Sequence, residues 1–192
     1  MSGEAASGEF RAEWIAGLSN TDGETRRASA ARIAGCGRER AERASAGWWR
    51  NAEFARLCDR ELPTVGLAVL PATFAAIRAS NGWPRLAEVP PDQDASEFEL
   101  QFEGGVSLDV LTSREPEGPG AIARFLARQG EGVQQVEFPS TDVSRATAIL
   151  RDEFGVQPVY AEKTRGADGT LVNFFLVGAP GSKVLIELYE GP

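Results

Sequence analysis

The passage from a helix to a strand around Gly130 constrains the fold more than any other feature of the chain. A helical segment with one apolar face runs into this glycine, and a strand at 133–138 follows directly. Near the C-terminus a second strand, 184–189, sets one carboxylate, Glu187, in an apolar run. We interpret these two segments as the first and last strands of one βαβββ module.

The residues between these two strands complete the module. Ser140, Thr141 and Asp142 are typical of a helix start, and Gly155 ends the apolar stripe that follows. Strands are then expected at 158–163, 171–177 and 183–189, separated by glycine-rich turns. The order is strand, helix and three strands.

An earlier copy of this order lies between Leu62 and Leu111. It consists of a strand at 64–70, a helix at 71–80 and two strands at 97–103 and 106–111. The sequence therefore predicts an α+β fold of two βαβββ modules, 62–118 and 119–192, within one domain at 62–192.

Residues 1–61 are predicted to form a helical N-terminal extension. Gly35 is expected to end one helix, and a further helix is expected over 38–62. That helix carries the aromatic side chains of Trp48 and Trp49, which we expect to pack against the main domain. The alternatives are a lid over a pocket and a dimer contact.

The charge of the chain limits its partners. The formal net charge is −8, so no basic surface is expected to meet nucleic acid or an anionic membrane. The N-terminus lacks the basic and apolar regions of a signal peptide, and no apolar run is long enough to span a bilayer, which predicts a cytoplasmic protein. The chain has no histidine, the commonest general base and transition-metal ligand.

Two stretches of the second module resemble a known superfamily. Residues 125–136, together with Val172-Asn173-Phe174 and 181–188, resemble the vicinal oxygen chelate superfamily of glyoxalase I, methylmalonyl-CoA epimerase, extradiol dioxygenases and bleomycin-resistance proteins. The likeness is closest to methylmalonyl-CoA epimerase, covers about 62–189, and implies a glyoxalase-like domain. In such a domain each module is a curled mixed sheet with a helix on its convex side, and the paired concave faces form the site.

The resemblance also implies site residues. The metal-ligand positions of the family correspond to Thr64, Asp109, Gln135 and Glu187. The epimerases have histidine at the first and third positions, and glutamine and glutamate at the others, so only Glu187 is kept. Their other catalytic carboxylate corresponds to Glu99, with Asn173 as its counterpart in the second module.

Strand parity supports this mapping without the resemblance. Glu99 and Gln101 alternate with apolar residues on one strand, and Asp109 and Glu187 do so on two others. One face of each strand is therefore a core face, and the other meets solvent or a cavity. For Glu99 a solvated strand face is the alternative to a catalytic role, whereas the apolar flanks of Glu187 favour a site role.

These residues offer only oxygen ligands to a metal, and only two of the four positions carry charge. Without imidazole we expect no tightly bound metal, and a weak site for a hard divalent cation is the alternative. We expect instead that Glu99 and Glu187 act as an acid–base pair beside a carbonyl group. The expected substrate contacts are Thr64, Gln101, Asp109, Gln135 and Asn173.

The predicted function is that of an isomerase, epimerase or lyase acting on a small organic substrate, by analogy an acyl thioester or a polyketide-like molecule. The alternative is a metal-free protein that binds or sequesters an antibiotic-like molecule, which the −8 charge and the missing histidines also fit. An enclosed cavity that contains Glu99, Glu187 and Gln135 would favour an enzyme, and a wide aromatic groove would favour binding. The superfamily also leads us to expect a homodimer.

Overall fold

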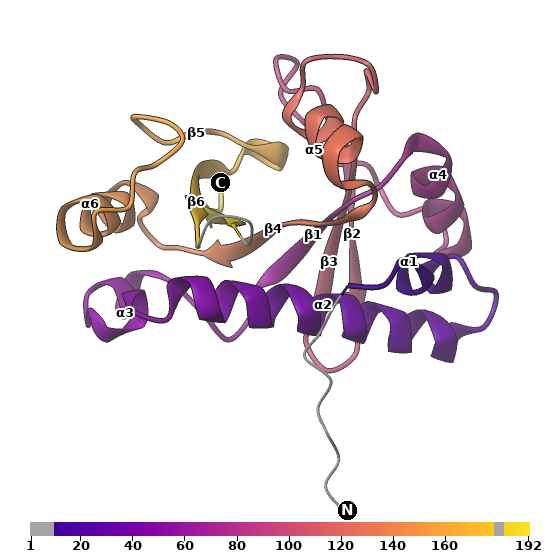
Figure 1. Ribbon diagram of the computed structural model, residues 1–192, viewed down its shortest axis with the longest axis horizontal. Helices are drawn as coiled ribbons and strands as arrows, with labels where there is room; N and C mark the ends of the chain where they lie inside the picture. The colour runs from indigo at the N-terminus through magenta and orange to yellow at the C-terminus, as the bar shows by residue number, and fades with distance from the viewer. Residues whose placement is uncertain (1–9, 179–182) are drawn as a thin grey trace, which may run out of the picture.

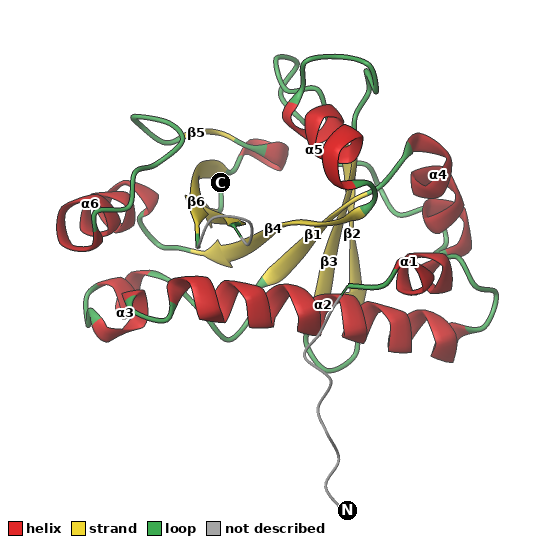
Figure 2. Cartoon of the chain, viewed as in Figure 1, coloured by secondary structure: helices red, strands yellow, loops and turns green. Residues whose placement is uncertain are grey.

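One mixed seven-stranded sheet organises the protein (Figures 1 and 2). The computed structural model describes residues 10–178 and 183–192. The strand order is β2-β3-β1-β4-β7-β6-β5. The strands are β1 (Thr64–Ala68), β2 (Ser96–Phe102), β3 (Val106–Thr112), β4 (Gly132–Pro139), β5 (Thr164–Arg165), β6 (Leu171–Val177) and β7 (Val184–Glu190). The helices are α1 (Ala12–Leu18), α2 (Gly23–Ser45), α3 (Phe54–Leu57), α4 (Pro71–Ser80), α5 (Ala121–Gln129) and α6 (Val143–Phe154), with short 3-10 turns η1 (Trp48–Arg50) and η2 (Ala167–Gly169).

The pairing of the strands confirms the internal repeat. In each module the first and last strands are parallel neighbours, β1 with β3 and β4 with β7, and a helix follows the first strand. The two modules meet at the centre of the sheet, where β1 and β4 pair antiparallel. The predicted α+β fold class is therefore confirmed.

The modules differ from the expected pattern in their second strands. In the first module, the described residues between α4 and β2 form no strand. This segment contains Pro84, Pro90 and Pro91, which lack the N–H that a strand ladder needs. In the second module the strand is only Thr164–Arg165, and Pro158 makes a single bridge to Phe175.

The N-terminal helices share one hydrophobic core with the sheet. The helix α2 crosses one face of the sheet against β1, β3, β4 and β7, and Figure 1 shows α5 on the opposite side. The largest fully buried side chains of this core come from α1, α2, α3, α4, α6 and the strands: Leu18, Ile33, Phe54, Leu67, Ile77, Phe98, Leu108, Ile149, Leu150, Phe175, Ile186 and Leu188. As expected, the aromatic residues pack inward, with Trp49 against Phe138 of β4. Residues 1–9 of the extension lie outside the described part.

The course of α2 corrects the prediction for Gly35. The helix continues through Gly35 to Ser45 and is followed by η1 and the short α3, so no single helix covers 38–62. Packing explains one of its glycines, Gly37. A Cβ atom on Gly37 would lie 2.6 Å from Cγ1 of Val65, whereas Gly35 has no neighbour within 4 Å. Gly37 therefore lets α2 approach β1 closely.

None of the helices in residues 10–178 and 183–192 is long and apolar enough to cross a lipid bilayer. The homodimer stays a prediction.

We predict opposite effects for two alanine substitutions in α2. Gly37→Ala should lower the free energy of unfolding by about 1–3 kcal/mol, because the new methyl group overlaps Val65. Gly35→Ala should raise it by up to about 1 kcal/mol, because alanine is the better helix former and the site is open. Urea unfolding of both variants measures this difference. Equal effects of the two substitutions would contradict the close contact between α2 and β1.

Candidate active site

The face of the sheet opposite α2 carries polar side chains in rows that run across the strands. In the first row, Glu99 pairs with Asp109, Asp109 with Gly66, and Gly66 with Gln135. Residues that are paired across neighbouring strands point to the same face. Four adjacent strands therefore bring two carboxylates and one amide together over a glycine.

The second row lies beside the first. Gln101 pairs with Ser107 and Ser107 with Thr64; Thr64 then pairs with Glu137 and Glu137 with Glu187. Glu97, two residues before Glu99, lies on the same face. We call this face of the sheet the acidic face, because it carries five carboxylates: Glu97, Glu99, Asp109, Glu137 and Glu187.

Gly66 allows the two rows to come together at the centre of the sheet. A Cβ atom at this position would lie 2.4 Å from Cγ of Gln135. Any side chain at position 66 would therefore displace Gln135. The glycine is required because the stem of Gln135 lies directly over β1.

Gln135 connects two of the carboxylates. Its amide nitrogen donates hydrogen bonds to Oε2 of Glu187 at 2.7 Å and to Oε1 of Glu137 at 3.0 Å. Glu187 and Gln135 are both 8% exposed. The amide thus holds two neighbouring carboxyl groups in place with little access to water.

Burial and like charge favour the protonated forms of these acids. Burial, opposed in part by the hydrogen bond from Gln135, raises the pKa of Glu137 to about 8. Burial and the charge of Asp168 raise the pKa of Glu97 to about 7. Burial and the charge of Glu137 also raise the pKa values of Asp109 and Glu187. Acids with such pKa values can both accept and donate a proton near neutral pH.

The sheet is curled so that distant strands face one another. Burial raises the pKa of Tyr189 on β7 to about 12, and the charges of Glu137 and of Glu99 on β2 add to the effect. The two edges of the sheet are also joined. Arg85, before β2, forms an ion pair with Asp168, after β5, at 2.6 Å, and the carboxylate of Asp168 also accepts the N–H of Glu88 at 2.8 Å. The acidic face therefore lies on the inside of the curl.

Six of the seven predicted site residues lie on this face. They are Thr64, Glu99, Gln101, Asp109, Gln135 and Glu187. Asn173 does not join them, because it pairs with Leu188 and points to the opposite face. Its side chain accepts the N–H of Phe174 at 2.9 Å and donates to the carbonyl of Tyr160 at 3.1 Å. In place of Asn173, Phe174 is the residue of β6 that lies beside Glu187.

Glu99 and Glu187 differ in their surroundings. Glu187 is buried and accepts a hydrogen bond from Gln135. Glu99 is exposed and accepts a hydrogen bond from Gln101 at 3.3 Å. Three strands lie between β2 and β7 in the sheet. Among the described residues, no hydrogen-bonded side chain joins Glu99 to Glu187.

Three further residues of this face were not predicted from the sequence: Glu97, Glu137 and Tyr189. Each of them is two residues away from a predicted residue on the same strand: Glu99, Gln135 or Glu187. The period of two in a strand was the signal that could have identified them.

The residues of this face do not fit the histidine-bound metal that the resemblance implies. The chain has no histidine, and the amide of Gln135 places donor hydrogens between Glu137 and Glu187. Within the described residues, no group of three His, Cys, Asp or Glu side chains is arranged to hold a metal ion. The absence of a tightly bound metal stays a prediction.

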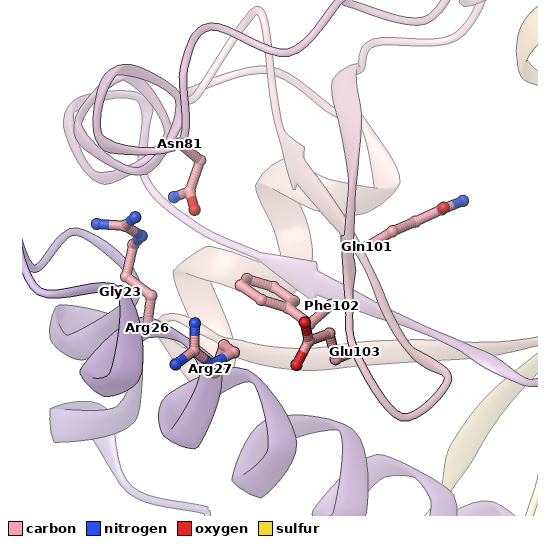
Figure 3. Close-up of a pocket in the computed structure, with 7 residues that line it drawn as sticks. All are labelled: Gly23, Arg26, Arg27, Asn81, Gln101, Phe102 and Glu103. Atoms are coloured by element: carbon pink, nitrogen blue, oxygen red, sulfur yellow. The ribbon is translucent and has the colours of Figure 1, made fainter.

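A shallow hollow of about 220 Å³ lies outside the acidic face, at the N-terminus of α2 (Figure 3). Figure 3 shows Phe102 pointing toward Arg26 and Arg27, and Gln101 pointing to the other side of β2. Arg26 is already engaged, since it donates to the carbonyl groups of Asn20 and Thr21. This hollow is therefore separate from the candidate site.

The raised pKa values predict that stability falls as the pH rises. Between pH 5.5 and 8 the folded protein retains protons on Glu137 and Glu97 that the unfolded chain, with glutamate pKa values near 4.5, has released. The free energy of unfolding should therefore decrease over this range, by about 1–3 kcal/mol. Urea unfolding at several pH values measures the decrease, and Glu137→Gln should make it smaller. Glu117→Gln, at an exposed position, is the control that should keep the wild-type slope. A free energy of unfolding that rises over this pH range would contradict the raised pKa values of Glu137 and Glu97.

No protein-family model and no curated protein sequence matches the chain. Among solved structures, the chain is similar to a methylmalonyl-CoA epimerase from Mycobacterium tuberculosis, with 27% identity, a TM-score of 0.55 and coverage of 71% of this chain and 88% of that chain. A methylmalonyl-CoA epimerase in complex with methylmalonyl-CoA and NH4+ is 30% identical, with a TM-score of 0.50 and coverage of 67% and 92%. A variant of the Streptomyces coelicolor epimerase in complex with 2-nitronate-propionyl-CoA is 29% identical, with a TM-score of 0.50 and coverage of 67% and 94%. The chain belongs to the vicinal oxygen chelate superfamily, and methylmalonyl-CoA epimerases are among its relatives of known structure.

Proposed function

We propose that this protein is an epimerase-like enzyme that removes and returns a proton at the carbon next to the carbonyl group of an acyl thioester. The observation that carries the proposal is the buried Glu187, held by Gln135 beside Glu137. Relatives of known structure hold methylmalonyl-CoA and 2-nitronate-propionyl-CoA, which are both acyl-CoA-type ligands. Their similarity to this chain supports a thioester substrate.

Glu187 is the proposed base. Burial raises its pKa, so its carboxylate accepts a proton more readily than an ordinary glutamate. In the proposed step the carbon–hydrogen bond breaks, the proton moves to a carboxylate oxygen of Glu187, and the electron pair forms an enolate. The hydrogen bond from Gln135 to Oε2 fixes the orientation of the carboxylate during this transfer.

Glu99 is the proposed partner acid. It lies on β2, across the curl from β7, so it can give a proton to the opposite side of the same carbon. Proton removal on one side and return on the other inverts the configuration. The exposure of Glu99 lets it exchange protons with water between turnovers.

The enolate oxygen needs hydrogen-bond donors. Thr64 is on the acidic face at 8% exposure and can supply a hydroxyl group. A carboxyl group that stays protonated in a buried site can also donate to an oxyanion. Burial and the surrounding carboxylates raise the pKa of Asp109, which suits it to this role.

A second candidate function is metal-free binding or sequestration of a small molecule. The observation that favours it is that the five carboxylates of the acidic face have no ion pair among the described residues. A positively charged ligand would meet them with strong attraction. Turnover distinguishes this candidate from an enzyme.

We predict that the wild-type protein incorporates deuterium from D2O at C2 of a 2-methyl-branched acyl-CoA. Isobutyryl-CoA and methylmalonyl-CoA are the first substrates to compare, with exchange followed by mass spectrometry. Glu187→Gln should lower the exchange rate by about 100-fold or more, since loss of a positioned base typically has this effect. Glu117→Gln should leave it unchanged.

Circular dichroism and urea unfolding of Glu187→Gln provide the control for folding. Exchange by this variant at the wild-type rate would remove Glu187 from the mechanism. Tight binding of a ligand without exchange by the wild-type protein would favour sequestration.

A further inference from the structure

We propose that the acidic face selects substrates by charge: it accepts an acyl group that carries an ammonium group near the reacting carbon and rejects one that carries a free carboxylate. This inference rests on the proposed function in taking the inside of the curled sheet as the binding site. It adds the class of substrate. The acyl group that we propose is positively charged, whereas the acyl group of methylmalonyl-CoA, which is bound in the structure of one relative, is negatively charged.

The inward-facing strand positions contain no basic residue. Strand pairing places alternate residues of β1, β2, β3, β4, β6 and β7 on this face, among them Glu97, Glu99, Asp109, Glu137 and Glu187. Five of them are carboxylates, and none is lysine or arginine. The substrate would therefore meet acidic groups from β2, β3, β4 and β7, and no basic group.

The cations nearest to this face are engaged elsewhere. Arg85 pairs with Asp168 where the sheet edges meet, and Lys163 pairs with Glu190. Glu190 is in register with Leu171 and points away from the acidic face, one position after Tyr189. Arg114 lies close enough to Glu97 to oppose the rise of its pKa, and it donates to Ser96. None of these cations pairs with Asp109, Glu137 or Glu187.

Three of the carboxylates have fewer partners than buried charge requires. Within the described residues, the carboxyl group of the half-buried Asp109 has no hydrogen bond and no ion pair. Glu137 and Glu187 share one hydrogen-bond donor, the amide of Gln135. A buried carboxylate is stabilised by a cation, and an added anion raises its free energy further. An ammonium group on the ligand would favour the ionised forms of these carboxyl groups and supply the missing counter-charge.

The apolar residues of the same face limit where the charge can sit. Phe174 lies beside Glu187, and Leu185 lies beside Gln135. This side of the site suits the hydrocarbon part of an acyl chain. The ammonium group would then lie over the row that joins Asp109 and Gln135 across Gly66.

Three CoA thioesters of nearly equal size test the selection. Isobutyryl-CoA is the neutral reference, 3-aminoisobutyryl-CoA replaces one methyl group with an ammonium-bearing carbon, and methylmalonyl-CoA replaces it with a carboxylate. The CoA part is common to all three, so differences in the dissociation constant report the acyl charge. Calorimetry at pH 7.5 and low salt should give 3-aminoisobutyryl-CoA the lowest dissociation constant, about tenfold below that of isobutyryl-CoA. Methylmalonyl-CoA should bind about tenfold more weakly than isobutyryl-CoA.

Variants assign the effect to the acidic face. Glu137→Gln and Asp109→Asn should each reduce the preference for the ammonium group several-fold and improve the binding of methylmalonyl-CoA. Glu117→Gln removes one surface charge and should leave the order unchanged. If one of the two site variants does not fold, as judged by circular dichroism, the other still provides the test.

The outcomes separate this inference from the proposed function. Equal binding of the three thioesters, tighter binding of methylmalonyl-CoA, or no binding of any of them would overturn the selection. If deuterium exchanges into isobutyryl-CoA but the three thioesters do not bind in the predicted order, the selection by charge is overturned and the proposed proton transfer is supported. If the three thioesters bind in the predicted order but no deuterium exchanges, the selection by charge is supported and the proposed proton transfer is overturned.

Discussion

The antiparallel pairing of β1 with β4 is the constraint on which the rest of the structure depends. It joins the two modules and places Gly66 opposite Gln135. Because Gly66 has no side chain, Gln135 can lie across β1 and reach Glu137 and Glu187 with one amide nitrogen. The register at this joint therefore decides whether the carboxylates of the second module are held in place. A shift of one residue would move them to the opposite face.

The two faces of the sheet differ in polarity and in their effect on stability. The face under α2 is apolar, and Gly37 lets the helix lie against Val65. The other face collects carboxylates that burial and mutual repulsion keep partly protonated. Repulsion of this kind costs stability, and the tight packing on the helix side offsets it. A cluster of unpaired acids that persists in a folded protein is an expected property of a functional site.

The metal positions of the superfamily illustrate how one fold can support another chemistry. The resemblance assigns these positions to Thr64, Asp109, Gln135 and Glu187, which supply hydroxyl, carboxyl and amide groups. A hydroxyl group and a protonated carboxyl group can donate hydrogen bonds to an oxyanion, which is the task that our proposal assigns to Thr64 and Asp109. The fold is therefore shared with the epimerases, whereas the chemistry of the site has to be derived from the residues present.

The sequence by itself determined the first and last strands of each module and the parity of most site residues, because alternation with a period of two is a local property. Glu99, Gln101, Asp109 and Glu187 could be assigned to a polar face on this basis. The tertiary structure alone decided which strands are neighbours and in which register, so only it grouped Glu137 with Glu187 and turned Asn173 to the other face. It also decided the course of α2 through Gly35 and Gly37, since a glycine ends a helix or permits a close contact according to what packs against it.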